Sequence, residues 1–253
     1  MAEMKVALQV YTIREHLGDA AGFTDAMKKV REIGYEYVEL AGVGDVSLAD
    51  QKRICDEAGL TIIASHTGYG AFAADLDAVI ADHKLLAAEY AIVPGLPGEL
   101  RNAEGYAQAA AAMTAWSETL AEAGIGLAYH NHDMEFEKFG GRLAMDILFQ
   151  DSGPKVGSEL DLYWVQHGGA SPVAWIKRLA GRLPLLHLKD FEIRDGEQLF
   201  AEVGEGNLEW DAIFAAASEA GTKWLAVEED RCTRPSMESI AISFRNLHAM
   251  GMC

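Results

Sequence analysis

The chain has 253 residues, of which 50% are hydrophobic and 24% charged, so it is long and apolar enough to bury a large core. Its formal net charge of −18, from 39 acidic and 21 basic side chains, repels phosphate backbones and argues against nucleic acid as a partner. Its apolar runs fall far short of the ~20 residues of a membrane span and no linker-like tract divides it, so we expect one domain over residues 1–253 and no membrane partner.

The first half of the chain alternates short apolar runs, typical of strands, with amphipathic segments, typical of helices. Phe23, Met27, Val30 and Ile33 lie at helical spacing and predict a first helix that ends at Gly34. Strand Val6–Tyr11 precedes this helix. The elements after it are strand Tyr35–Leu40, helix Leu48–Ala58, strand Leu60–Ser65, helix Leu76–Ala88, strand Tyr90–Pro94 and helix Ala103–Ala123.

The second half repeats the alternation four more times. Its predicted elements are strand Ile125–His130, helix Leu143–Phe149, strand Val156–Asp161, helix Pro172–Leu179, strand Leu185–Lys189, helix Trp210–Ala220, strand Trp224–Glu228 and helix Met237–Met250. Strands separated by helices imply parallel pairing with right-handed crossovers. Eight such units in this length favour a closed (β/α)8 barrel over an open doubly wound sheet, and active sites of such barrels lie at the carboxyl ends of the strands.

Polar side chains gather where the predicted strands end. They are Glu39, His66, His130, His132, Glu159, Asp161, His187, Lys189, Glu228, Glu229 and Asp230. Residues two apart on a strand share a face, so several of these can point inward as pairs. Imidazole together with carboxylate suits Mn²⁺, Zn²⁺, Fe²⁺ or Co²⁺ better than Ca²⁺. The pattern predicts a divalent-metal site at this rim, although any one of these residues alone would be an ordinary loop group. Tyr163 and Trp164 would form an apolar wall against a sugar or else pack in the core.

Other motifs that would indicate a different chemistry are weak. The segment Gly204–Gly206 (GEG) carries an acid and is no dinucleotide fingerprint, and the sequence contains no P-loop or GxSxG. The cysteines Cys55, Cys232 and Cys253 form neither a disulfide framework nor a nucleophile motif, and residues 1–14 do not read as a signal peptide. A reducing, cytoplasmic location is therefore expected.

Five segments in the second half form an ordered set of motifs. They are Tyr129–Phe136 (YHNHDMEF), Glu159–Trp164 (ELDLYW), His187–Asp190 (HLKD), Gly204–Gly206 (GEG) and Val227–Asp230 (VEED). In these motifs the chain resembles the xylose isomerase-like TIM barrels, the sugar phosphate isomerase/epimerase family, and in particular their YHNHxxEF branch. The likeness spans essentially the whole chain and implies a single TIM barrel.

The resemblance also implies one divalent metal held by a Glu from strand five, an Asp from strand six, a His from strand seven and a Glu from strand eight. The last three correspond to Asp161, His187 and Glu228. Manganese is the expected ion, with Zn²⁺, Co²⁺, Fe²⁺ and Mg²⁺ as alternatives.

The strand-five ligand departs from the family pattern. Family members carry the ligand glutamate six residues after a glycine, and the residue six after Gly124 is His130. A histidine thus replaces the glutamate, His132 takes the second inward position, and Glu135 is an alternative ligand.

Because that glutamate is missing, Glu228 is the only family-matched carboxylate base. We expect an isomerase or epimerase of a keto-sugar or related polyol that works through an enediolate. Glu228 would abstract the proton, His132 would be its acid/base partner, and Lys189 would stabilise the negative charge. The residues expected to bind substrate are Glu39, His66, Glu159, Trp164 and Arg231. The alternative is a metal-dependent lyase, a dehydratase or β-eliminase of a keto-sugar, keto-inositol or 3-keto-glycoside.

The expected partner is a small-molecule sugar. No cluster of basic residues marks a phosphate site near strands seven and eight, which favours an unphosphorylated substrate. A DNA-repair endonuclease with this barrel would need a basic groove, and the charge of −18 argues against it. A non-catalytic sugar-binding barrel and a homo-oligomer both stay open.

Overall fold

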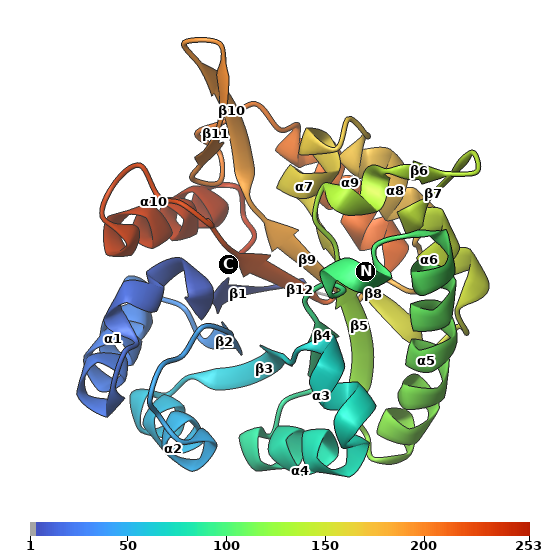
Figure 1. The fold of residues 1–253 in the computed structure, drawn as a ribbon. Helices are drawn as coiled ribbons and strands as arrows, with labels where there is room; N and C mark the ends of the chain where they lie inside the picture. Colours follow the sequence, from blue (N-terminus) through green and yellow to red (C-terminus); the bar gives the residue numbers. More distant parts are fainter. Residues whose placement is uncertain (1–3) are drawn as a thin grey trace.

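Eight parallel strands close into a barrel in the computed structural model, which describes residues 4–253 (Figure 1). The strands are β1 (Lys5–Gln9), β2 (Tyr37–Leu40), β3 (Thr61–His66), β4 (Tyr90–Val93), β5 (Gly126–His130), β8 (Val156–Asp161), β9 (Leu185–Leu188) and β12 (Trp224–Val227). Each pairs with its neighbours in chain order, and β1 pairs with β12 to close the ring. The predicted (β/α)8 TIM barrel is confirmed. Residues 1–3 of the expected domain lie outside the described residues.

The helices surround the barrel and follow the predicted alternation (Figure 1). They are α1 (Ala20–Ile33), α2 (Leu48–Ala58), α4 (Leu76–Leu86), α5 (Ala103–Glu122), α6 (Ala144–Asp151), α8 (Pro172–Arg178), α9 (Trp210–Ala220) and α10 (Ser236–Ala249). Side-chain caps fix several helix starts, since Asp19, Ser47 and Asn102 each accept a hydrogen bond from a backbone N–H of the first turn. None of the helices described in residues 4–253 is both long and apolar enough to cross a membrane.

Several short elements were not predicted, and all lie in segments that follow a strand. They are η1 (Val10–His16), α3 (Tyr69–Ala74), η2 (Gly98–Leu100), η3 (Met134–Phe136), the hairpin of β6 (Lys138–Phe139) and β7 (Arg142–Leu143), α7 (Leu162–His167), and the hairpin of β10 (Asp190–Arg194) and β11 (Glu197–Ala201). The first strand was expected to run to Tyr11, which is wrong. It ends at Gln9, whose side chain accepts a hydrogen bond from the N–H of Tyr11 and starts η1.

The barrel interior is apolar in the half that holds the amino ends of the strands. A separate cluster of buried residues fills it, namely Ala7, Ile63, Ala64, Ile92, Ala128, Leu185, Trp224 and Ala226, with Tyr37 and Tyr90 packed against them. The rings of Tyr37 and Trp224 lie 4.8 Å apart. A Cβ at position 126 would lie 2.5 Å from the ring of Tyr90, so Gly126 leaves the space that this ring fills. The polar residues at the carboxyl ends of the strands therefore lie above a packed apolar layer, here named the floor.

The long hairpin β10–β11 projects from the barrel (Figure 1), and hydrogen bonds to one side chain hold its base. The buried carboxylate of Asp190 accepts hydrogen bonds from the backbone N–H groups of Gly204, Gly206 and Leu208 at 2.9–3.1 Å, and from the indole of Trp210 at 2.7 Å. A Cβ at position 206 would lie 2.4 Å from that carboxylate. The GEG segment thus wraps a side chain of the protein itself.

Candidate metal centre

Four of the polar strand-end residues converge at the carboxyl end of the barrel. His130, Asp161, His187 and Glu228, here named the Asp161 group, come from β5, β8, β9 and the residue after β12. Each offers a nitrogen or oxygen atom, and these atoms all lie within 4.8 Å of one another. All four side chains are buried. The structure therefore brings together the four residues that the sequence predicted as metal ligands.

The contacts within the Asp161 group suit a cation. Nδ1 of His187 lies 2.7 Å from Oε2 of Glu228 and 3.8 Å from Oδ2 of Asp161. Nε2 of His130 lies 3.9 Å from the same Asp161 oxygen. Two imidazoles and two carboxylates form a donor set that Mn²⁺, Fe²⁺, Co²⁺ and Zn²⁺ accept. The residues present thus fit one divalent metal ion.

Lys189 lies beside this group, with its ammonium 2.9 Å from Asp161, 2.7 Å from Glu228 and 2.7 Å from Asp230. Burial alone would lower its pKa, but these three carboxylates raise it well above the usual value, so Lys189 is a cation. Asp230 belongs to no ligand group and gives the ammonium a partner of its own.

The two carboxyl groups of the set differ in their environment. Burial would raise the pKa of Glu228, but Lys189 and His187 hold it well below its usual range. For Asp161 burial prevails over the same two cations, and its pKa is raised to about 6. Glu228 is therefore the more firmly ionised of the two.

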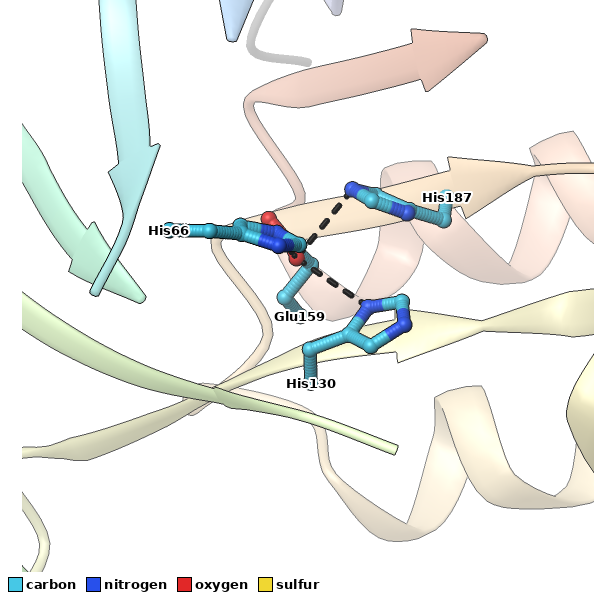
Figure 2. A group of neighbouring side chains, drawn as sticks. All are labelled: His66, His130, Glu159 and His187. Carbon is cyan, nitrogen blue, oxygen red and sulfur yellow. Dashed lines mark hydrogen bonds and ion pairs between the residues drawn. The ribbon is translucent and has the colours of Figure 1, made fainter. Parts of the chain in front are cut away.

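A second group shares two histidines with the first. His66, His130, Glu159 and His187, here named the Glu159 group, also have ligand atoms within 4.8 Å of one another. Figure 2 shows the three imidazole rings around the Glu159 carboxylate. Its Oε2 lies 2.9 Å from Nε2 of His66, 3.1 Å from Nδ1 of His130 and 3.1 Å from Nε2 of His187.

Glu39 completes the surroundings of the Glu159 group, with its carboxylate 2.8 Å from Nε2 of His66 and 3.1 Å from Nε2 of His187. Burial would lower the pKa of His66, but Glu39 and Glu159 outweigh it and raise the pKa to about 9. Burial would also lower the pKa of His187, but the same carboxylates, with Glu228, raise it well above its usual value. Burial and the neighbouring His187 lower that of His130, which is therefore neutral.

The remaining predicted residues lie at different distances from the centre. His132 is partly buried with its ring 4.8 Å from that of His130, and burial followed by Lys189 lowers its pKa to about 4. Trp164 contacts the His132 ring at 5.5 Å and Arg231 is exposed. The alternative ligand Glu135 points elsewhere, since it accepts hydrogen bonds from the Tyr129 hydroxyl and the His132 N–H, each at 2.8 Å.

A cavity of about 310 Å³ opens onto the centre. It is lined by Tyr11, Ala41, Gly42, His66, Pro94, His130, His132, Glu228 and Asp230. Tyr11 and Gly42 were missed by the sequence analysis. A Cβ on Gly42, whose φ is +65°, would lie 2.6 Å from the Tyr11 ring, so this glycine leaves room for the ring at the mouth of the cavity. The signals were present in the sequence, an aromatic residue at the end of one predicted strand and a glycine just after the next, but they are too common to single out.

Comparisons with known proteins agree with this architecture. A family model described as "Xylose isomerase-like TIM barrel" matches residues 27–248. The rhizopine catabolism protein MocC of Rhizobium meliloti is 25% identical over 256 residues, which covers 85% of this chain and 77% of MocC. Two crystal structures of sugar phosphate isomerase/epimerase proteins from Parabacteroides distasonis are also similar. One has 25% identity, a TM-score of 0.81 and coverage of 97% of this chain and 98% of its own. The other has 24% identity, a TM-score of 0.83 and coverage of 100% and 98%.

Proposed function

The chain belongs to the xylose isomerase-like TIM barrel family, and from this premise we propose that it is a divalent-metal-dependent isomerase or epimerase of a sugar or related polyol. The observation that carries the proposal is the convergence of His130, Asp161, His187 and Glu228 beside an open cavity. Burying acidic and imidazole groups at one point lowers the stability of the fold, and such clusters are typical of catalytic sites.

The Asp161 group would hold the metal ion. When bound, a divalent ion supplies Lewis acidity that polarises a carbonyl and its neighbouring hydroxyl. Mn²⁺ is the ion that we propose first, because two carboxylates with two imidazoles give it both oxygen and nitrogen donors.

Glu228 is the proposed base. It lines the cavity, and Lys189 and His187 keep its carboxylate ionised, so it can remove the proton next to a substrate carbonyl and return it to a neighbouring carbon. Lys189 lies 2.7 Å from Glu228, and its ammonium is the group that we propose to stabilise the negative charge of the enediolate.

His132 is the proposed partner acid/base. Its lowered pKa makes it neutral near pH 7, and its buried Nδ1 has no hydrogen-bond partner in the described residues. A neutral imidazole that lines the cavity can accept a proton from one substrate hydroxyl and pass it to the neighbouring oxygen. Glu228 would then move the carbon-bound proton and His132 the oxygen-bound one.

The cavity favours an uncharged sugar. Its polar lining consists of a tyrosine, histidines and carboxylates, and the nearby Lys189 is already paired with three carboxylates. Of the proposed substrate contacts, His66 lines this cavity, whereas Glu39 and Glu159 are fully buried beside it. Trp164 and Arg231 would contact only a substrate that extends beyond the cavity.

One observation favours a lyase as the second candidate. His130 stands where the family pattern has a glutamate. The Asp161 group therefore contains one glutamate, Glu228, instead of two. An epimerase that works on both faces of a carbon needs a second base of matched strength. A β-eliminase needs one base and an acid that assists the leaving oxygen, and Glu228 with His132 or Lys189 meets that requirement.

A screen of keto-sugars and 3-keto-glycosides in D₂O with added Mn²⁺ tests the proposal. An isomerase or epimerase gives a product with the substrate's formula and with deuterium next to the carbonyl. A lyase gives a product that has lost water or an aglycone and absorbs as an unsaturated ketone. A protein that binds the metal but exchanges no deuterium into any of these compounds would be a non-catalytic binding barrel, and the proposal would fail.

A further inference from the structure

The two groups at the centre use opposite nitrogens of the same two histidines. His187 turns Nδ1 towards Asp161 and Glu228, and Nε2 towards Glu39 and Glu159. His130 turns Nε2 towards Asp161 and Nδ1 towards Glu159. The histidines therefore stand between two sets of carboxylates (Figure 2 shows the Glu159 side).

We propose that the Glu159 group is a second divalent-cation site, suited to nitrogen-preferring ions such as Zn²⁺, and that it cannot be filled together with the Asp161 group. The proposal rests on metal binding at this centre and not on the reaction, so its test reads the position of the ion.

The donor set supports this assignment. Three imidazole nitrogens surround one carboxylate oxygen of Glu159 at 2.9–3.1 Å, with Glu39 adjacent. This is a nitrogen-rich set, which Zn²⁺, Co²⁺ and Ni²⁺ bind more tightly than Mn²⁺ does. The Asp161 group has one imidazole fewer and one carboxylate more, and its carboxylates, unlike Glu159, contact the Lys189 ammonium.

Hydrogen bonds alone leave the Glu159 group incomplete. Oε1 of Glu159 is buried without a hydrogen-bond partner in residues 4–253, whereas Nδ1 of His130 and Oε1 of Glu39 contact Glu159 and His66. Glu159 is 0% exposed, so water at the surface does not satisfy its Oε1. Unpaired buried polar atoms are rare in folded proteins, and a cation is a common reason for them.

Mutual exclusion follows from the chemistry of imidazole. A neutral imidazole has one nitrogen that donates a proton and one that offers a lone pair. When His187 binds an ion through Nδ1, its Nε2–H is donated to Glu39 or Glu159. When it binds through Nε2, its Nδ1–H is donated to Glu228, 2.7 Å away. Either tautomer has an acceptor, so the fold supports each position but not both at once.

The test compares two isosteric variants, Glu159→Gln and Asp161→Asn, each of which removes one charge from one group only. Zn²⁺ and Mn²⁺ contents would be measured by elemental analysis, affinities by competition with a chelator, and ion positions by anomalous scattering from crystals. Wild type should hold one Zn²⁺ per chain, between His66 and Glu159. Asp161→Asn should keep that ion, and Glu159→Gln should lose it or bind Zn²⁺ about 10–100-fold more weakly.

His66→Asn gives an independent check, because His66 belongs to the Glu159 group alone. It should weaken Zn²⁺ binding at least tenfold and leave Mn²⁺ affinity within about twofold. His132→Asn, a cavity residue in neither group, is the matched control and should change neither.

Zn²⁺ found only in the Asp161 group, no Zn²⁺ in Asp161→Asn, or two fully occupied ions in one chain would each overturn the inference. If one of these results is found and Mn²⁺ still binds in the Asp161 group, the second site is ruled out but the proposed function is not. Absence of any bound ion in wild type would contradict both.

Discussion

The two halves of the barrel interior have the same backbone but opposite contents. The half near the amino ends of the strands, here called the lower half, holds Tyr37, Trp224 and aliphatic side chains. The half near the carboxyl ends, the upper half, holds imidazoles, carboxylates and the ammonium of Lys189. Along β12 the change takes place within a few residues, from Trp224 and Ala226 to Glu228. Alternation along a strand fixes which residues point inward, but not whether they are apolar.

This difference separates stability from function. Apolar side chains in the lower half gain free energy on burial at about 25 cal/mol per Å². Charged groups in the upper half lose hydration on burial, and only interactions with partner groups offset that free-energy cost. The lower half should therefore carry the stability of the barrel interior, and the upper half its chemistry. Four experiments test that division.

Glu228→Gln should have the largest effect. The variant keeps an oxygen ligand but removes the base, so turnover should fall roughly 10²–10⁴-fold while metal content stays near one ion per chain. Steady-state kinetics and metal analysis measure the two. Near-normal turnover in Glu228→Gln, together with complete loss in His132→Ala, would assign the base to the histidine instead.

Trp224→Ala should cost about 3–5 kcal/mol of unfolding free energy, because it opens a cavity in the floor and removes the contact with Tyr37. Denaturant unfolding measures the change, and Trp224→Phe, which keeps an aromatic ring, is the control with a smaller loss. Turnover per folded molecule should change far less than in Glu228→Gln. A loss of unfolding free energy below about 1 kcal/mol would show that this apolar layer contributes little to the stability of the barrel.

Metal removal should have an intermediate effect. An ion present at a hundred times its Kd stabilises the folded state by about 2.7 kcal/mol, so chelation should lower the Tm by roughly 5–10 °C in a protein of this size. Scanning calorimetry with and without a chelator measures it, with back-titration of Mn²⁺ as the control. An unchanged Tm at saturating Mn²⁺ would argue against an ion bound selectively by the folded state.

Asp161→Asn in the metal-free protein should have the smallest effect, within about 1 kcal/mol of metal-free wild type. Asp161 caps α7 by accepting a hydrogen bond from the Trp164 N–H at 2.9 Å, and asparagine caps helices equally well. Lys189 keeps Glu228 and Asp230 as partners. A loss above about 3 kcal/mol by denaturant unfolding would instead mark Asp161 as a structural centre of the rim.

Much of the barrel could be predicted from the sequence, because each strand–helix unit carries its own local signals. The predicted bounds of Leu48–Ala58, Val156–Asp161 and Trp210–Ala220 coincide with α2, β8 and α9. The hairpins and short helices after the strands were missed since they lack a strong period. The hairpin β10–β11, for example, depends on contacts of Asp190 with residues 14 to 20 positions away.

The candidate site divides in the same way. The positions of His130, Asp161, His187 and Glu228 follow from strand alternation and from the motifs, and the structure brings their ligand atoms together. The Glu159 group could not be predicted, because its contacts join strands across the barrel. Glu159 and His66 are 93 residues apart, and Glu39 and His187 are 148 residues apart. Sequence spacing indicates the rim on which a residue lies but not its partner there.

The fastening at Asp190 makes the hairpin β10–β11 a natural place for engineering. The Asp190 carboxylate binds the N–H groups of Gly204, Gly206 and Leu208 and the Trp210 indole. These hydrogen bonds fix the base of the hairpin independently of the residues at its tip. We expect the tip around Asp195 and Gly196 to accept shortening or an inserted tag without disturbing the start of α9. Phe200 marks how far such a change can extend, since its ring stacks on Tyr163 at 4.0 Å and contacts Trp164 at 5.8 Å.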